Sequence, residues 1–314
     1  MPPTEDQFEL ALAEAILGMK GSGREVLIDD LVSRIRSSRN PDATKEVVLD
    51  SDVLVVAVKP VELLACRIAF DMLDTEPIRA GTDSAEFWMS TMNGTRYIVT
   101  SVGEAGTVEA SVFMSGVRDI VSSELAVLVG MAVGNSDEGI ELGGVVVGTT
   151  VWDYQLARLA AEGHRSQAKP YTSKYKKTHL TGSLRNLSAW SRSLREELLL
   201  ARDHPEVADF RINFDQLGEM RPSVDVGNII SGGWLFEDGS FPFFASSIPG
   251  KVLAGDMESA GFAAACDSAS LPWLVSRGIA DFGEPGRQKH LQLQATFLAA
   301  CFVRDRIVPR LGLA

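Results

Sequence analysis

Short, nearly continuous runs of β-branched residues are the feature that most constrains the fold of this chain. Uninterrupted apolar runs of this length are typical of strands buried on both faces of a sheet. The runs occupy residues 52–58, 96–102, 125–133 and 145–151, with further candidates at 224–230 and 271–277. Stretches with helical periodicity separate several of them, at residues 61–73, 106–120, 256–269 and 289–308. Strands that alternate with helices predict an α/β protein, here a three-layer α/β/α sandwich with a mixed central sheet.

The first 48 residues have a different pattern and are predicted to form a short α-helical hairpin. Residues 5–19 and 25–38 each place apolar side chains on one helical face, and Gly-Ser-Gly at 21–23 separates the two helices. We therefore divide the chain into a hairpin over residues 1–48 and a larger α/β domain over residues 49–314. The hairpin is either a docking or regulatory device or an additional packing layer, and the pattern alone supports both.

The charge and cysteine content exclude several classes of protein. The 314 residues include 30 Lys and Arg against 42 Asp and Glu, a net charge of -12, which disfavours binding to long nucleic acids and anionic membranes. No run approaches about 18 uninterrupted apolar residues, and the N-terminus lacks the regions of a signal peptide. Cys66, Cys266 and Cys301 are odd in number and far apart, as in reduced proteins. We expect a soluble, cytoplasmic protein.

No metal, dinucleotide or serine-hydrolase motif is complete in the sequence. The histidines are too scattered for paired ligand spacing, at His164, His179, His204 and His290, and no Cys-x-x-Cys occurs. The glycines of residues 101–106 follow a strand pattern but do not complete a phosphate-binding fingerprint. No Gly-x-Ser-x-Gly is present. We expect neither a bound metal ion nor a cofactor.

Three acidic residues stand at strand ends or helix starts, where open α/β sheets place their ligands. Glu62 follows the run at 52–58, Glu258 opens an Ala- and Gly-rich helical pattern, and Asp281 ends the last strand pattern. Two of them also have a structural interpretation, Glu62 as a first-turn helix acid and Asp281 as a helix N-cap. An acid such as Glu258 is unfavourable in an apolar helix unless a ligand or hydrogen bonds satisfy it. These three residues are the candidate site.

Four segments carry a resemblance to a known family. They are AVKPVELLA (57–65), VGMAVGNSDEGIELGGVVVGTTVWDY (129–154), VGNIISGGWLFED (226–238) and GDMESAGFAAACDSASLPWLVSRGIADFG (255–283). Together they resemble the nucleoside phosphorylase and methylthioadenosine/adenosylhomocysteine nucleosidase superfamily, and more specifically the nucleosidase-like domains of bacterial antiphage defence. The resemblance runs from about residue 50 to residue 310, so the first fifty residues lie outside it.

The resemblance implies hydrolysis of the N-glycosidic bond of a purine nucleoside or nucleotide. Asp281 matches the family's general acid, which protonates the purine N7, and Glu62 matches the glutamate that activates the attacking water. Glu258 matches the acid that holds the ribose hydroxyls, with Met257 against the sugar. Cleavage through an oxocarbenium-like state needs one protonated and one ionised carboxyl group on opposite sides of the sugar. Asp281 and Glu62 are expected to supply them.

Two departures from the family pattern bear on the reaction. Phosphorylases of the family place phosphate ligands where this sequence has Leu128 and Met131, so we expect water rather than phosphate to attack. Ala280 stands where many nucleosidases have a serine beside the acid, which affects how the base is positioned. A phosphate-dependent purine nucleoside phosphorylase and a non-catalytic nucleotide sensor on the same fold are the alternatives.

Further residues are expected to bind the base and line the pocket. Trp234 or Phe236, which follow the Ser-Gly-Gly sequence, are candidates to stack on the purine. Met131 is expected to line the substrate pocket in place of a phosphate ligand.

The resemblance also implies that one basic segment, which follows the strand pattern ending in VWDY, lies close to where family members admit the 5′ side of the sugar. Residues 155–195 contain nine Lys or Arg and one Glu, a local charge of +8. We hypothesise that Arg165 and Lys169, with Lys174 or Lys177, bind a 5′-phosphate chain, which predicts an adenine nucleotide such as ATP or AMP as substrate. The alternative is a solvated helix and loop that pairs with the acidic remainder of an oligomer.

The resemblance also bears on partners and biological role. Family members assemble as dimers or hexamers, so we expect a homo-oligomer. A nucleosidase in antiviral defence would deplete a nucleotide pool, and residues 1–48 would then contact a partner of the defence system.

Overall fold

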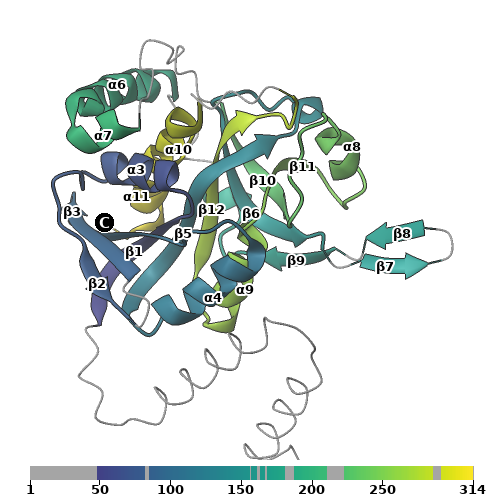
Figure 1. Cartoon of the computed structure of the whole chain (residues 1–314), viewed down its shortest axis with the longest axis horizontal. Helices are drawn as coiled ribbons and strands as arrows, with labels where there is room; N and C mark the ends of the chain where they lie inside the picture. The colour runs from purple at the N-terminus through teal and green to yellow at the C-terminus, as the bar shows by residue number, and fades with distance from the viewer. Residues whose placement is uncertain are drawn as a thin grey trace, which may run out of the picture. The chain divides into compact units, whose positions relative to one another are not determined.

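A mixed sheet runs through the computed structural model, which describes residues 48–81, 85–155, 157–160, 163–166, 168–180, 187–210, 223–285 and 291–313. Its strands are β1 Leu49–Ala57, β2 Ile78–Ala80, β3 Ala85–Met92, β4 Thr95–Ser101, β5 Val121–Gly134, β6 Val145–Asp153, β9 Lys169–Thr172, β10 Val224–Ser231, β11 Val252–Asp256 and β12 Trp273–Asp281. Their order is β11-β10-β6-β12-β5-β1-β4-β3-β2, with β9 paired to β6 (Figure 1). β1 is parallel to β4 and β5, whereas β12 is parallel to β5 and antiparallel to β6.

Helices connect the strands and cover the sheet. Their bounds are α3 Pro60–Ala69, α4 Thr107–Val117, η1 Ser136–Glu138, α5 Lys177–Leu180, α6 Leu187–Leu200, η3 Ala201–Asp203, α7 Pro205–Asp209, α8 Phe241–Ala245, α9 Ser259–Ser268, α10 Leu291–Phe302, the π-helical η5 Val303–Ile307 and α11 Val308–Leu311. A separate two-stranded hairpin pairs β7 Ala157–Ala160 with β8 Gly163–Ser166.

The sheet has a hydrophobic core on each face, as the period of two along a strand requires. In β1, Val53 joins the core that contains Phe297 of α10, whereas its neighbour Leu54 joins the core that contains Phe262 of α9. Helices α3 and α10 therefore cover one face and α4 and α9 the other (Figure 1). The three-layer α/β arrangement with a mixed central sheet confirms the predicted fold class.

The predicted strands and helices correspond to observed elements, with shifted boundaries. The run at 52–58 belongs to β1, which begins at Leu49, and the run at 271–277 belongs to β12, which begins at Trp273 and extends to Asp281. The strands β2, β3, β7, β8, β9 and β11 were not predicted. The predicted helical hairpin lies outside the described residues except for Val48, so its structure stays a prediction; from Val48 onward the chain forms one compact unit.

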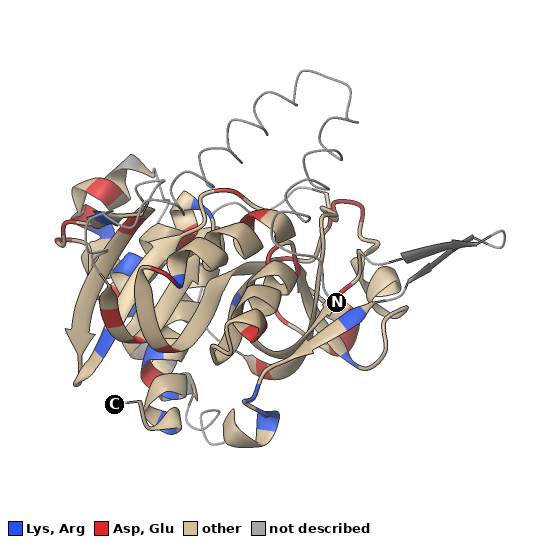
Figure 2. Ribbon diagram, turned by 90° about the horizontal axis from the view of Figure 1, so that it is seen from below, with Lys and Arg blue, Asp and Glu red and all other residues tan. Residues whose placement is uncertain are grey.

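Three further properties concern the cysteines, the helices and the charged residues. Cys66, Cys266 and Cys301 are free and buried. In the described part of the chain, no helix combines the length and apolarity needed to cross a bilayer. Acidic and basic residues are interspersed over the described elements (Figure 2).

Candidate active site

A pocket lies at the carboxyl ends of β1, β11 and β12, the edge where α/β sheets bind ligands. About 670 Å³ of space lies between its walls, including space that is open to solvent. It is lined by Val58, Lys59, Glu62, Met131, Ala132, Val133, Tyr154, Trp234, Leu235, Phe236, Gly255, Asp256, Met257, Glu258, Asp281 and Gln292. Parallel strands and the turns after them thus bring together residues more than 200 positions apart.

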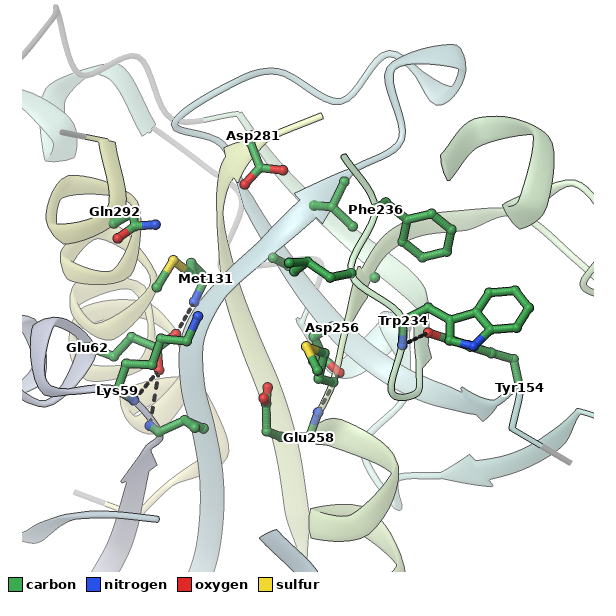
Figure 3. Close-up of a pocket in the computed structure, with 16 residues that line it drawn as sticks. Lys59, Glu62, Met131, Tyr154, Trp234, Phe236, Asp256, Glu258, Asp281 and Gln292 are labelled. Atoms are coloured by element: carbon green, nitrogen blue, oxygen red, sulfur yellow. Dashed lines mark hydrogen bonds between the residues drawn. The ribbon is translucent and has the colours of Figure 1, made fainter. Parts of the chain in front are cut away.

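Glu62 is fixed in this pocket by three backbone donors. It lies in the first turn of α3, which directly follows β1, and its side chain is buried. Its Oε2 accepts hydrogen bonds from the amides of Val58 at 3.1 Å and Lys59 at 2.8 Å, and its Oε1 accepts one from Met131 at 2.8 Å (Figure 3). An ionised carboxylate offers about four acceptor positions, so one remains for a ligand or a water.

Asp256 and Glu258, just before α9 begins, add two carboxyl groups to that of Glu62. Asp256 ends β11 and caps α9, because its Oδ1 accepts hydrogen bonds from the amides of Ser259 at 3.0 Å and Glu258 at 3.3 Å. Glu258, the N-cap residue of α9, is itself only 6% exposed. The cap therefore orients the turn from which Glu258 and Met257 line the pocket.

A fully buried arginine connects these carboxyl groups beneath the pocket. Arg277, in the middle of β12, donates from Nε to Asp256 at 2.8 Å and from Nη2 to Glu258 at 3.3 Å. Its Nη1 is buried without a hydrogen-bond partner among the described residues. It lies close to Gly130 of β5, as does Glu62 Oε1. Arg277 thus presents one unused donor on the Glu62 side of the pocket.

This cluster shifts the protonation of its members. Burial raises the pKa of Glu258 to about 7, although the charge of Arg277 acts in the opposite direction. Burial acts to lower the pKa of Arg277, but Asp256, Glu258 and Glu62 together raise it. Such shifts are common at functional sites. Near neutral pH, Glu258 therefore exchanges readily between its protonated and ionised forms.

Asp281 approaches the pocket from another wall. It is the last residue of β12 and is half-buried, and its Oδ1 accepts a hydrogen bond from the amide of Gly283 at 2.8 Å. Gly283 has a positive φ of 72°, so the chain turns away sharply after the strand. The turn leaves the carboxyl group of Asp281 facing the pocket (Figure 3).

An aromatic wall completes the site on the side of Tyr154. Its hydroxyl accepts a hydrogen bond from the amide of Trp234 at 3.0 Å, and the two rings lie 5.8 Å apart. Phe236 packs against Phe241 and Phe244 at 5.2 and 5.4 Å. Both predicted stacking candidates, Trp234 and Phe236, therefore line the pocket.

The structure brings together most, but not all, of the predicted site residues. Asp281, Glu62, Glu258, Met257, Trp234, Phe236 and Met131 line the pocket. Lys169 does not line it: the residue is exposed in β9, and its Nζ lies 4.8 Å from the centre of the Tyr171 ring. Arg165 belongs to β8, whose side chains lie outside the described part of the structure.

Sequence reasoning missed Arg277, Asp256, Tyr154, Lys59 and Gln292. A signal for Arg277 was available, because a charged residue inside an otherwise buried strand needs a partner. Lys59 and Gln292 carry no comparable signal, since polar residues at helix starts are common on protein surfaces. In the described part of the chain, no group of three or more His, Cys, Asp or Glu side chains forms a metal site.

Solved structures of bacterial nucleosidases share this fold. The 5′-methylthioadenosine/S-adenosylhomocysteine nucleosidase of Neisseria meningitidis has a TM-score of 0.58 at 17% identity, covering 82% of this chain and 98% of that chain. The futalosine hydrolase of Helicobacter pylori has a TM-score of 0.57 at 16% identity, covering 83% of this chain and 98% of that chain. At these identities the likeness concerns the fold.

Sequence comparisons reach the same family. The protein is 25% identical over 272 residues to the ATP nucleosidase Cap17 of Escherichia coli (strain KTE188), covering 84% of this chain and 52% of the relative. The chain thus spans about half the length of the curated relatives it matches. The family model described as Phosphorylase superfamily matches residues 53–301, most of the chain and all of the pocket residues described above. This protein therefore belongs to the phosphorylase superfamily.

Proposed function

We propose that this pocket hydrolyses the N-glycosidic bond of a purine nucleotide, with adenine as the preferred base and ATP or AMP as the substrate. The observation that carries the proposal is the convergence of Glu62, Glu258 and Asp281 on one pocket from three different elements. Cleavage of an N-glycoside needs an acid for the leaving base and a base for the attacking water. The pocket offers separate carboxyl groups for these tasks.

Glu62 and Arg277 are suited to hold and activate the attacking water. Three amides fix the Glu62 carboxylate and leave it one acceptor position, while the buried Nη1 of Arg277 is a donor without a partner in the described chain. The water donates one proton to Glu62 and bonds through its oxygen to C1′ of the sugar. Arg277 acts as a positioning residue for this water.

The leaving base is assigned to the wall of Asp281 and the aromatic side chains. As the bond between C1′ and N9 breaks, its electron pair moves to the purine, and the proton of Asp281 goes to N7. The purine is stacked against Phe236 or Trp234, which are exposed to the pocket. Glu258 and Met257 lie beneath the sugar, where the Glu258 carboxyl group accepts or donates hydrogen bonds to the ribose hydroxyls.

The residues at the predicted phosphate positions favour water over phosphate as nucleophile. Leu128 is fully buried in the core, and Met131 lines the pocket with an uncharged side chain. Neither residue can neutralise inorganic phosphate. The nucleotide preference is supported by the 25% identity to an ATP nucleosidase.

We also propose a biological role for this reaction. The enzyme would deplete a nucleotide pool in antiviral defence, and residues 1–48 would act as a docking device.

The proposal is tested by incubating the full chain with ATP, AMP, adenosine and methylthioadenosine, with and without inorganic phosphate, and measuring free base by chromatography. We expect adenine and the corresponding ribose phosphate from ATP or AMP without added phosphate. Strict dependence on phosphate would contradict hydrolysis in favour of phosphorolysis. No base from any of the four compounds would favour a sensor.

Asp281→Asn tests the assignment of the general acid. We expect base release to fall by about 10²- to 10⁴-fold, the usual contribution of a positioned acid, while nucleotide binding measured by calorimetry is retained. Asp119→Asn is the matched control, because the Asp119 side chain is 66% exposed on the surface outside the pocket. Unchanged turnover in Asp281→Asn would remove this residue from the mechanism.

A further inference from the structure

Two polar side chains of the pocket have no part in the proposed chemistry. Lys59 is the N-cap residue of α3, two residues after the end of β1, and Gln292 lies in the first turn of α10. Both line the pocket, and Figure 3 shows them on the same side as Glu62 and Met131, across from Trp234 and Tyr154. They belong to different elements, so the fold rather than the local sequence brings them together.

Lys59 supplies the one positive charge that lines this pocket in the described part of the chain. Its side chain extends over Glu62 toward the interior (Figure 3). No ion pair joins Lys59 to a carboxylate of the described residues, whereas Lys251 is paired with Glu138 at 2.9 Å. Glu62 already occupies the amides of Val58 and Lys59 just before α3, and Pro60 has no N–H. The ammonium group of Lys59 is therefore the charged donor that this helix start offers to an anion.

The orientation of the substrate places the 5′ side of the sugar toward these two residues. The base occupies the wall of Asp281, Phe236 and Trp234, and the ribose hydroxyls face Glu258. In a nucleoside the base is attached to C1′ and the 5′ carbon to C4′, on opposite sides of the ring oxygen, so the 5′ carbon lies at the end of the sugar away from the base. The remaining polar wall of the pocket is that of Lys59 and Gln292.

We infer that Lys59, assisted by the amide of Gln292, binds the first 5′-phosphate of the substrate and selects nucleotides over nucleosides. This inference rests on the proposed function, because it uses the orientation of the base and ribose given there. A lysine ammonium recognises phosphate as a compact point charge. One lysine reaches one phosphate, so AMP and ATP share this contact.

The basic strand β9 is less suited to this task within one chain. Lys169 is opposite Asp153 in the pairing of β9 with β6, next to Tyr154. Tyr154 belongs to the aromatic wall that is assigned to the base. A phosphate on the sugar's 5′ carbon points away from that wall.

The test compares substrates in Lys59→Met, Lys59→Arg and the matched surface control Lys251→Met. For each variant, kcat/KM is measured for AMP and for adenosine by chromatographic detection of adenine. Because charge-assisted hydrogen bonds are among the stronger ones in proteins, we expect Lys59→Met to lower the ratio of AMP to adenosine by about 10- to 100-fold. Lys59→Arg should retain most of the ratio, and Lys251→Met should leave it unchanged.

The outcomes separate phosphate recognition from other roles. Equal losses for AMP and adenosine would overturn the inference, because they would mean that Lys59 acts on Glu62 or on folding. An unchanged ratio would also overturn it. If the unmodified protein releases base from neither compound and not from ATP either, the proposed function fails, and calorimetric binding of AMP and adenosine then tests Lys59 alone. In that binding experiment, loss of the preference for AMP over adenosine in Lys59→Met would support the inference, and an unchanged preference would contradict it.

Discussion

At the scale of single residues, Arg277 determines how so many acids can share one pocket. One guanidinium group faces Asp256, Glu258 and Glu62, so carboxyl groups outnumber cations in its surroundings. Buried charges are unfavourable unless they are paired, and burial raises the pKa of Glu258. The excess of negative charge is relieved by the proton that Glu258 retains up to near-neutral pH. The same arginine keeps Nη1 directed to the side where Glu62 holds the proposed water.

Gly130 is the residue that lets Glu62 and Arg277 approach each other. A Cβ at this position would overlap Arg277 Nη1 and lie 2.5 Å from Glu62 Oε1. Both atoms belong to buried side chains that are held by hydrogen bonds, so in Gly130→Ala these side chains have to shift against their partners. A displacement of about 1 Å can lower the rate about 10²-fold. We predict a fall in kcat of about 10- to 100-fold, together with a loss of unfolding free energy of about 1–3 kcal/mol.

Gly148→Ala is the control for this prediction, because it adds the same atom to β6, which β12 separates from β5 and where Gly148 does not line the pocket. Its Cβ would lie 2.7 Å from Ile229 Cδ1 in the core, so it should lower stability and leave kcat unchanged. The prediction is tested by measuring kcat and the free energy of unfolding in denaturant for both variants. A normal kcat in Gly130→Ala would show that this approach is unimportant for the reaction.

The residues of the site differ in how far sequence reveals them. Glu62 and Asp281 were predicted to be near one another because each follows or ends a buried strand, and such ends meet at one edge of the sheet. Lys59 was missed because its importance depends on α10, which starts more than 200 residues later and places Gln292 beside it. The basic segment was assigned to the 5′ side of the substrate from its charge and from its place in the family pattern, and neither shows which wall of the pocket a given strand forms.

At the scale of elements, the pocket depends on close contact between α4 and α9. Gly261, in the first turn of α9, faces the backbone of Thr107 at the start of α4. Thr107 Oγ1 in turn donates a hydrogen bond to the carbonyl oxygen of Met257 at 2.9 Å. The contact between the helices therefore also fixes the turn that carries Met257 and Glu258.

Gly261→Ala is predicted to lower the free energy of unfolding by about 1–3 kcal/mol, the usual range for overpacking. The added Cβ would overlap the carbonyl oxygen of Thr107, a backbone atom that cannot rotate away. Gly116→Ala is the matched control on α4, because an added Cβ there meets no atom within 4 Å. It should raise stability by about 0.4–1 kcal/mol. Equal effects of the two substitutions in urea unfolding would contradict the proposed close packing.

The elements themselves were predictable where burial is nearly complete. β1 and β12 are buried on both faces, and their β-branched runs identified them. β2 lies at the edge of the sheet and β3 next to it, and polar residues such as Arg79 in β2 and Glu86 in β3 interrupt the apolar pattern. β11 is only five residues long and contains Ala254 and Gly255, which lack β preference. Strand order was not predictable, because it depends on pairings such as β11 with β5 that no local pattern encodes.

At the scale of the whole molecule, charge is distributed unevenly along the sequence. Over the described elements, by contrast, acidic and basic residues are mixed. The total of -12 includes a local charge of +8 over residues 155–195, while acidic and basic residues alternate over the described ribbon (Figure 2). A molecule of this charge repels long polyanions. A small phosphorylated ligand needs only one well-placed cation, and Lys59 meets that requirement inside the pocket.

The raised pKa of Glu258 also makes the stability of the whole molecule depend on pH. The folded state retains a proton up to about pH 7, whereas an unfolded glutamate releases it near pH 4.3. The stabilising contribution is therefore fully present below about pH 4.3 and is lost as pH rises through 7. Glu258→Gln, which mimics the protonated side chain at every pH, should remove this dependence.

We predict that the stability of the unmodified protein relative to Glu258→Gln falls between about pH 5 and 7 and is constant above that range. Urea unfolding at pH 5, 6, 7 and 8 measures the difference directly. Glu124→Gln, on an exposed position of β5, is the matched control, and its curve should run parallel to that of the unmodified protein. Parallel curves for Glu258→Gln as well would mean that Glu258 is ionised in the folded protein throughout this range. The proton would then be absent, and Arg277 alone would have to balance the carboxylates beneath the pocket.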